Sequence, residues 1–164
     1  MKIFGTAKGG AISKKNFGVA FGGNGVTPSS EITQENQNDN MGLLKDGTAG
    51  FGYIFEAGHD LIDKEVTSVS FYVKTYPDKP ITEGVISVYC GQNQTGTSGN
   101  VLIGSIDGTE FSTTTFEWKE FTGIATKTIT DDDQIWIQYS VAGDERLQVS
   151  RYYDGAVPPN FWGN

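Results

Sequence analysis

From residue 48 onward, short runs of alternating apolar and polar residues are separated by residues that favour turns. The runs are rich in Val, Ile, Thr, Phe and Tyr, and Gly, Pro, Asn and Asp lie between them. This pattern predicts β-strands, because successive side chains of a strand point to opposite faces and these residue types favour strands. The expected strands are residues 51–56, 66–75, 84–90, 101–106, 115–124, 134–141 and 147–153. Seven such strands predict an all-β fold, a single β-sandwich.

The same alternation gives each strand an inner and an outer face. Positions expected in the core are Val69, Phe71 and Val73; Ile86, Val88 and Cys90; Ile135, Ile137, Tyr139 and Val141; and Leu147 and Val149. The opposite faces carry small polar residues together with Tyr72, Tyr89 and Trp136. Three explanations stay open for these aromatic residues: contact with a glycan, a protein interface, or coverage by another part of the chain. Trp118, beside Phe116, is predicted to lie in the core.

Residues 1–47 are predicted to form a glycine-rich N-terminal arm, in which residues 28–40 are a polar linker. The arm contains one apolar strand, at about residues 16–22. Its bulky side chains fall on one side and its small ones on the other; the bulky residues are Phe17, Val19 and Phe21. A strand of this kind suits insertion along an open sheet edge. It pairs within its own domain, exchanges between subunits, or is disordered.

The charge is unevenly distributed along the chain. The net charge is −8, but residues 1–30 contain four Lys and no acidic residue, so the remainder carries −12. An acidic domain repels phosphates, which argues against nucleic-acid binding by the domain. No apolar run reaches the roughly 18–20 residues that span a membrane, and no signal peptide is visible at the start.

The strand succession resembles the galactose-binding-like jelly-roll domains of many carbohydrate-binding modules and of viral and surface proteins. The resemblance is carried by residues 66–74 (VTSVSFYVK), 84–89 (GVISVY), 102–105 (LIGS), 116–121 (FEWKEF) and 133–137 (DQIWI). It implies a single jelly roll over residues 48–164, with glycan or surface binding and often a structural calcium. Members usually finish with a further long strand, whereas this chain ends at residues 160–164 (NFWGN), so an open sheet edge is expected.

Few residues are suited to catalysis. The only histidine, His59, lies in a turn, and no Gly-x-Ser-x-Gly motif is present. Cys90 is the only cysteine, which excludes an intramolecular disulfide and favours a small buried side chain. We therefore expect that the protein is not an enzyme and assign no catalytic residue. A glycan hydrolase with two carboxylates is the alternative, because distances between acids are not visible in a sequence.

Three consecutive acids precede the predicted strand 134–141. Asp131, Asp132 and Asp133 repel one another unless water or a hard cation separates their charges, and Ca²⁺ is the cation that such oxygens prefer. A calcium site that includes these residues is one expectation. Ordinary solvated acids in a turn are the other.

Together these features predict a non-catalytic structural or surface protein, a self-assembling subunit of a virion or extracellular filament. The subunits would join through the N-terminal arm, so the main partner is a second copy of the chain. No cofactor is required on this interpretation. The alternative is a carbohydrate-binding module or adhesin that uses Tyr72, Tyr89 or Trp136. Either function places the protein outside the cell or on a virion.

Overall fold

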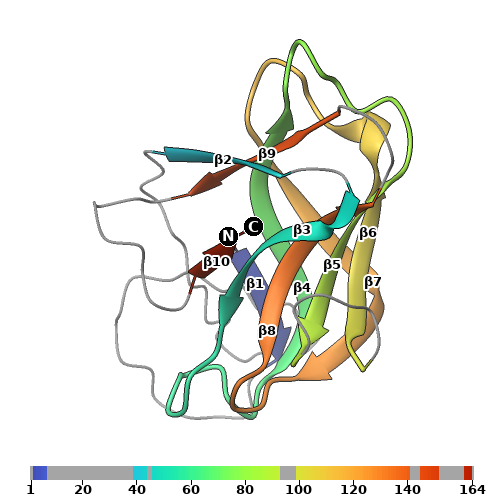
Figure 1. The fold of residues 1–164 in the computed structure, drawn as a ribbon. Coiled ribbons are helices and arrows are strands. Elements are labelled where there is room, and N and C mark those ends of the chain that lie inside the picture. Colours follow the sequence, from blue (N-terminus) through green and yellow to red (C-terminus); the bar gives the residue numbers. More distant parts are fainter. Residues whose placement is uncertain are drawn as a thin grey trace.

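The computed structural model describes residues 2–6, 39–43, 46–92, 99–140, 145–151 and 161–163, which form two antiparallel sheets (Figure 1). The elements are β1 (Lys2–Thr6), β2 (Asp39–Leu43), β3 (Asp46–Ile54), β4 (Glu65–Thr75), β5 (Val85–Gly91), β6 (Val101–Asp107), η1 (Gly108–Glu110), β7 (Glu117–Thr128), β8 (Gln134–Ser140), β9 (Leu147–Arg151) and β10 (Phe161–Gly163). Sheet A contains β1, β2, β4, β7 and β9, and sheet B contains β3, β5, β6, β8 and β10. The predicted all-β sandwich is confirmed.

The strands β3 to β9 coincide with the seven predicted runs. The largest differences lie at the start of β3, which begins at Asp46, and at the end of β7, which continues to Thr128. In β7 the pairing with β4 is interrupted by a bulge between Thr122 and Lys127, and it then resumes. Gly123 in this bulge has a φ of 85°, a conformation that favours glycine. The bulge explains why a continuous alternation did not extend to residue 128.

The hydrophobic core lies between the two sheets, where the alternation placed it. Every described residue that was assigned to an inner face is fully buried: Val69, Phe71, Val73, Ile86, Val88, Cys90, Ile135, Ile137, Tyr139, Leu147 and Val149. Val141 lies outside the described residues. Phe55, Ile103 and Phe121 complete the centre of the same cluster. Burial of so many branched and aromatic side chains supplies the main driving force for folding.

Two strands of the predicted arm belong to sheet A. β1 pairs with β4, and β2 pairs with β9. The predicted apolar strand with Phe17, Val19 and Phe21 lies outside the described residues, so its pairing stays a prediction. At the other end of the chain, β10 pairs with the edge of β3. The expected open edge is therefore covered there by a strand of three residues.

One long side of the sandwich is closed by β6 of sheet B and β7 of sheet A. Figure 1 shows these strands adjacent, and Gly104 of β6 faces the backbone of β7. A Cβ atom at residue 104 would lie 2.2 Å from the Thr122 nitrogen and 2.9 Å from the Phe121 Cα. Only glycine fits at this position without moving backbone atoms.

We expect Gly104→Ala to lower the free energy of unfolding by about 2 kcal/mol, because the added methyl group forces two backbones apart. Chemical denaturation of the variant and the wild type measures this change. Gly104 does not have a positive φ, so backbone strain at residue 104 does not add to the effect of the close contact. A Gly104→Ala variant as stable as the wild type would contradict the close approach of β6 and β7.

Candidate functional site

Three aromatic side chains form a row on the outer face of sheet A. We call Tyr72, Phe116 and Trp118 the aromatic ladder. Tyr72 in β4 and Trp118 in β7 are cross-strand partners, and Phe116 lies immediately before β7. The exposed fraction of Trp118 is 37%, and Tyr72 and Phe116 are half-buried. The ladder is therefore held by the sheet and is open to a partner from outside.

The rings of the aromatic ladder stack on one another, which holds them in a defined arrangement. The Tyr72 and Phe116 ring centroids are 5.4 Å apart at an interplanar angle of 29°, and those of Tyr72 and Trp118 are 5.2 Å apart at 36°. The Lys74 ammonium lies 5.0 Å from the centroid of the Phe116 ring. Ring pairs at these separations stabilise their arrangement by about 0.5–1.5 kcal/mol each. Tyr72 thus occupies the middle of a preorganised stack.

Hydrogen-bonding side chains surround the ladder on the same face. Ser70 is the cross-strand partner of Glu120, and the Ser68 hydroxyl donates a hydrogen bond to the Glu120 carboxylate at 2.8 Å. On the other edge of β4, Gln148 of β9 is the partner of Lys74 and is half-buried. Ser68 and Ser70 are buried, so the polar groups that a ligand could reach beside this apolar platform are those of the exposed Glu120 and the half-buried Lys74 and Gln148.

The other two candidate aromatics lie on the outer face of sheet B. Trp136 is only 1% exposed. Its ring stacks on that of the half-buried Tyr89, with centroids 5.7 Å apart. Gly52 of β3 is the partner on the other side, and a Cβ there would lie 2.7 Å from the Trp136 Cβ. Of the three explanations, coverage within the chain applies to Trp136.

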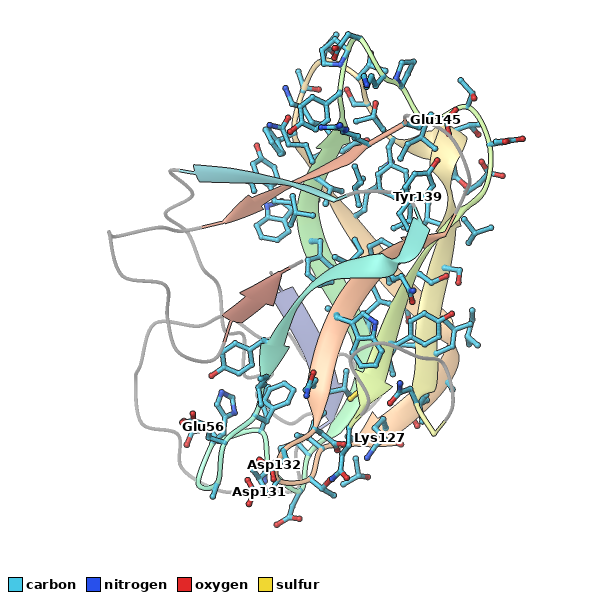
Figure 2. All side chains as sticks on the ribbon, viewed as in Figure 1. Glu56, Lys127, Asp131, Asp132, Tyr139 and Glu145 are labelled. Atoms are coloured by element: carbon cyan, nitrogen blue, oxygen red, sulfur yellow. The ribbon has the colours of Figure 1, made fainter. Side chains whose placement is uncertain are left out.

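The structure separates the three consecutive acids. Asp133 is 1% exposed, and its Oδ2 atom accepts hydrogen bonds from the Lys127 ammonium, the Thr130 backbone nitrogen and the Thr130 hydroxyl, at 2.7, 2.7 and 2.8 Å. Asp131 and Asp132 are exposed at one end of the sandwich, where Figure 2 labels them close to Lys127. Asp133 therefore closes the turn that leads into β8.

A calcium site at this turn stays a prediction. In the part of the chain that the structure describes, no group of three His, Cys, Asp or Glu side chains lies close enough to hold a metal. One oxygen of Asp133 is already engaged by three donors. The carboxylates that remain open to solvent are those of Asp131 and Asp132.

His59 has a structural place in its turn. Its Nδ1 atom accepts a hydrogen bond from the Leu61 nitrogen at 3.1 Å, and its ring packs edge-on against Tyr53 and Phe55. Burial lowers the pKa of His59 below its ordinary value. Cys90 is fully buried, as predicted, and burial raises the pKa of its thiol, which makes the nucleophilic thiolate unfavourable.

A buried tyrosine joins β8 to two loops at the opposite end of the sandwich from Asp131 (Figure 2). The Tyr139 hydroxyl donates a 2.7 Å hydrogen bond to the Glu145 carboxylate, which also accepts one from the Thr82 nitrogen at 3.2 Å. Burial raises the pKa of Tyr139, and the neighbouring Glu145 and Glu83 raise it further. The neutral phenol is thus part of the folded structure.

We expect the free energy of unfolding to fall as the pH rises above about 10, the ordinary pKa of tyrosine. The folded-state pKa of Tyr139 is raised, so its ionisation favours the unfolded chain; its contribution is complete below pH 10 and is lost above it. Denaturation at several pH values between 8 and 11 measures the slope. Tyr139→Phe should reduce that slope. Equal slopes in the wild type and in Tyr139→Phe would disprove the assignment.

Phe116 and Trp118 were not among the predicted site residues. Trp118 was expected in the core, whereas its side chain is the exposed end of the ladder. The signal was available in the alternation of β7. Counting back in steps of two from the buried Phe121 passes through Lys119 and Glu117, which puts Trp118 on the outer face. The two apolar neighbours suggested burial, but the parity of the strand predicts exposure.

Comparison of the chain with protein-family models, with curated proteins and with solved structures found no match. In the described residues, no helix has the length and apolar character needed to cross a membrane.

Proposed function

We propose that the protein is a non-catalytic β-sandwich module that binds carbohydrate through the aromatic ladder. The observation that carries the proposal is the preorganised row of Tyr72, Phe116 and Trp118 on the outer face of sheet A, with Trp118 37% exposed. The alternative function predicted from the sequence thereby becomes the leading one. Its residues change, because Trp136 is covered and the ladder adds Phe116 and Trp118.

The chemistry of a sugar ring fits this surface. One face of a pyranose presents C–H groups that pack on an aromatic ring, and its rim presents hydroxyl groups that need hydrogen-bonding partners. Lys74 lies at the Phe116 end of the ladder, and Glu120 lies two residues after Trp118 in β7. This local balance and the net charge of −8 favour a neutral glycan over a polyanionic one.

The proposed fold is a jelly roll of the galactose-binding-like kind. Consecutive strands cross repeatedly between the sheets: β3 is in sheet B, β4 in A, β5 and β6 in B, β7 in A, β8 in B and β9 in A. Repeated crossing of this kind is typical of a sandwich wound from Greek keys. It supports the jelly-roll part of the proposal, and the galactose-binding-like kind rests on the resemblance of the sequence alone.

The test is binding to an array of neutral polysaccharides, such as β-glucan, xylan, mannan and galactan. We expect Trp118→Ala to weaken binding at least tenfold, because a ligand loses its most exposed aromatic contact. The melting temperature should change by only a few degrees, since Trp118 is not part of the core.

Ile124→Ala is the matched control for this test. Ile124 is a large apolar residue on the same strand, 54% exposed in the bulge of β7 and outside the ladder. The control should bind like the wild type. A wild type that binds no polysaccharide, or a Trp118→Ala variant that binds as well as the control, would refute the proposal.

Self-assembly through the N-terminal arm is a second proposed function, for a subunit of a virion or extracellular filament. It rests on the arm, because arm residues in β1 and β2 supply strands of sheet A and could supply the same strands to a neighbouring copy. The two functions are compatible, since the ladder lies at the β4–β7 side of sheet A and β1 lies on the other edge of β4. A location outside the cell or on a virion belongs to both proposals.

A further inference from the structure

One edge of β4 is shared by two strands that come from distant parts of the chain. β1 pairs with residues 65–70 of β4, and β9 pairs with residues 73–75 (Figure 1). The opposite edge of β4 pairs with β7 along most of its length. β1 therefore occupies a slot on β4 that ends where β9 begins.

This slot requires a strand. Val66 and Val69 are fully buried, and Ser68 and Ser70 on the other face are only 4% exposed. Without β1, the backbone N–H and C=O groups on this edge of β4 would lose their ladder partners in a largely buried setting, which is unfavourable. The slot is consequently filled in any stable state of the domain.

The strand that fills the slot need not come from the same copy of the chain. Residues 7–38 separate β1 from β2, a connection of 32 residues. Such a connection spans up to about 100 Å when extended, several times the radius of gyration of about 15 Å expected for a domain of this size. β1 can therefore reach the slot of a neighbouring copy while β2 stays paired with β9 of its own.

Exchange changes no contact at the slot itself, because the same residues pair in the same register. The charges permit exchange as readily as pairing within one chain, since residues 1–30 carry +4 and the rest of either copy carries −12. Each whole chain has a net charge of −8, so two copies repel each other. Residues 1–30 form the only stretch of thirty residues in the sequence with a clearly positive net charge. The arm thus offsets the repulsion between two acidic copies.

We propose that β1 is exchanged between copies of this chain, so that Lys2–Thr6 of one copy pairs with Glu65–Ser70 of another. This proposal rests on the proposed self-assembly and specifies which strand connects the subunits. The register places Lys2 opposite Ser70, Ile3 opposite Val69 and Phe4 opposite Ser68. Reciprocal exchange gives a closed dimer, and one-way exchange gives a filament. The exchanged strand is then β1 rather than the predicted strand at residues 16–22.

Disulfide trapping between two different variants tests the exchange. A Lys2→Cys chain and a Ser70→Cys chain with different tags are unfolded, mixed, refolded together at high concentration and oxidised. Directly opposite residues of antiparallel strands have Cα atoms about 4.5–5.5 Å apart, within the range of a disulfide. A bond between these two chains forms only if β1 of one copy pairs with β4 of the other.

The expected result is a covalent heterodimer on a non-reducing gel, absent when either variant is oxidised alone. Native Cys90 is fully buried, so it does not provide an accessible background thiol. The second pair, Phe4→Cys with Ser68→Cys, tests the same register two residues away if the first pair does not fold. The double variant Lys2→Cys/Ser70→Cys shows whether the strand pairs within one chain.

Two results would overturn the exchange. A double variant that cross-links only as a monomer, with no heterodimer in the mixture, shows that β1 stays in its own chain. The absence of any cross-link in both register pairs shows that β1 is not the strand in the slot. Light scattering of the wild type distinguishes the exchange of β1 from the broader proposal of self-assembly. If the wild type is an oligomer but no covalent heterodimer forms, the chain assembles through another contact. If the wild type is a monomer at all concentrations, both proposals are wrong.

Discussion

Trp136→Ala is expected to lower the free energy of unfolding by about 3–5 kcal/mol, the usual cost of truncating a buried tryptophan. Trp136 is 1% exposed and stacks on Tyr89, and Gly52 lies beside it on β3. Alanine would leave a cavity on the outer face of sheet B that this rigid strand pairing cannot fill. The measurement is urea denaturation of both proteins at neutral pH.

Trp118→Ala is the matched comparison for Trp136→Ala, because both replace a tryptophan on an outer sheet face. The Trp118 variant should lose about 1 kcal/mol or less, since 37% of its side chain is already exposed. On the proposed function, Trp136 therefore contributes to stability and Trp118 to carbohydrate binding. If Trp136→Ala is no more destabilising than Trp118→Ala, the burial of Trp136 is wrong.

Asp133→Ala is expected to lower the free energy of unfolding by about 3 kcal/mol. The substitution removes the acceptor of three hydrogen bonds at the turn before β8, and it leaves the partly buried Lys127 ammonium without its counter-ion. The same turn holds the chain to β3, because the Asp132 nitrogen donates to the Phe55 carbonyl and the Phe55 nitrogen to the Asp133 carbonyl. Thermal and urea denaturation measure the loss.

Asp131→Ala serves as the control for Asp133→Ala, because Asp131 is the exposed neighbour in the same turn. Its stability should change by less than about 0.5 kcal/mol. Asp133→Asn keeps the shape and one acceptor oxygen, so it should fall between the two. Equal effects of the Asp131 and Asp133 substitutions would show that the turn does not depend on the buried carboxylate.

The strands and their inner faces could be predicted because a period of two is a local property of the sequence. Val69, Phe71 and Val73 show it without any knowledge of their neighbours, and all three are fully buried. The outer faces could not be predicted in the same way. Trp136 and Tyr72 have similar local patterns, but Trp136 lies beside Gly52 in the middle of a sheet, and Tyr72 lies beside Trp118 near the sheet edge. The alternation of a single strand does not show which outer aromatic ring another part of the chain covers.

The acidic triplet illustrates a second limit. Composition treats Asp131, Asp132 and Asp133 alike, yet only Asp133 points into the fold and accepts the Thr130 nitrogen. The difference follows from the turn, in which Asp132 has a φ of 64° and the Asp133 nitrogen donates to the Thr130 carbonyl. Adjacent identical residues receive different roles from backbone geometry that a residue count does not contain.

The central claim is that the aromatic ladder binds carbohydrate, and the most direct measurement is a calorimetric titration. The wild type, Trp118→Ala and Ile124→Ala are each titrated with the polysaccharide that binds the wild type best on the array. We predict saturable binding by the wild type and by Ile124→Ala with equal affinity, and binding by Trp118→Ala at least tenfold weaker at an unchanged fold. Equal affinity of all three proteins, or no saturable binding by the wild type, would contradict the claim.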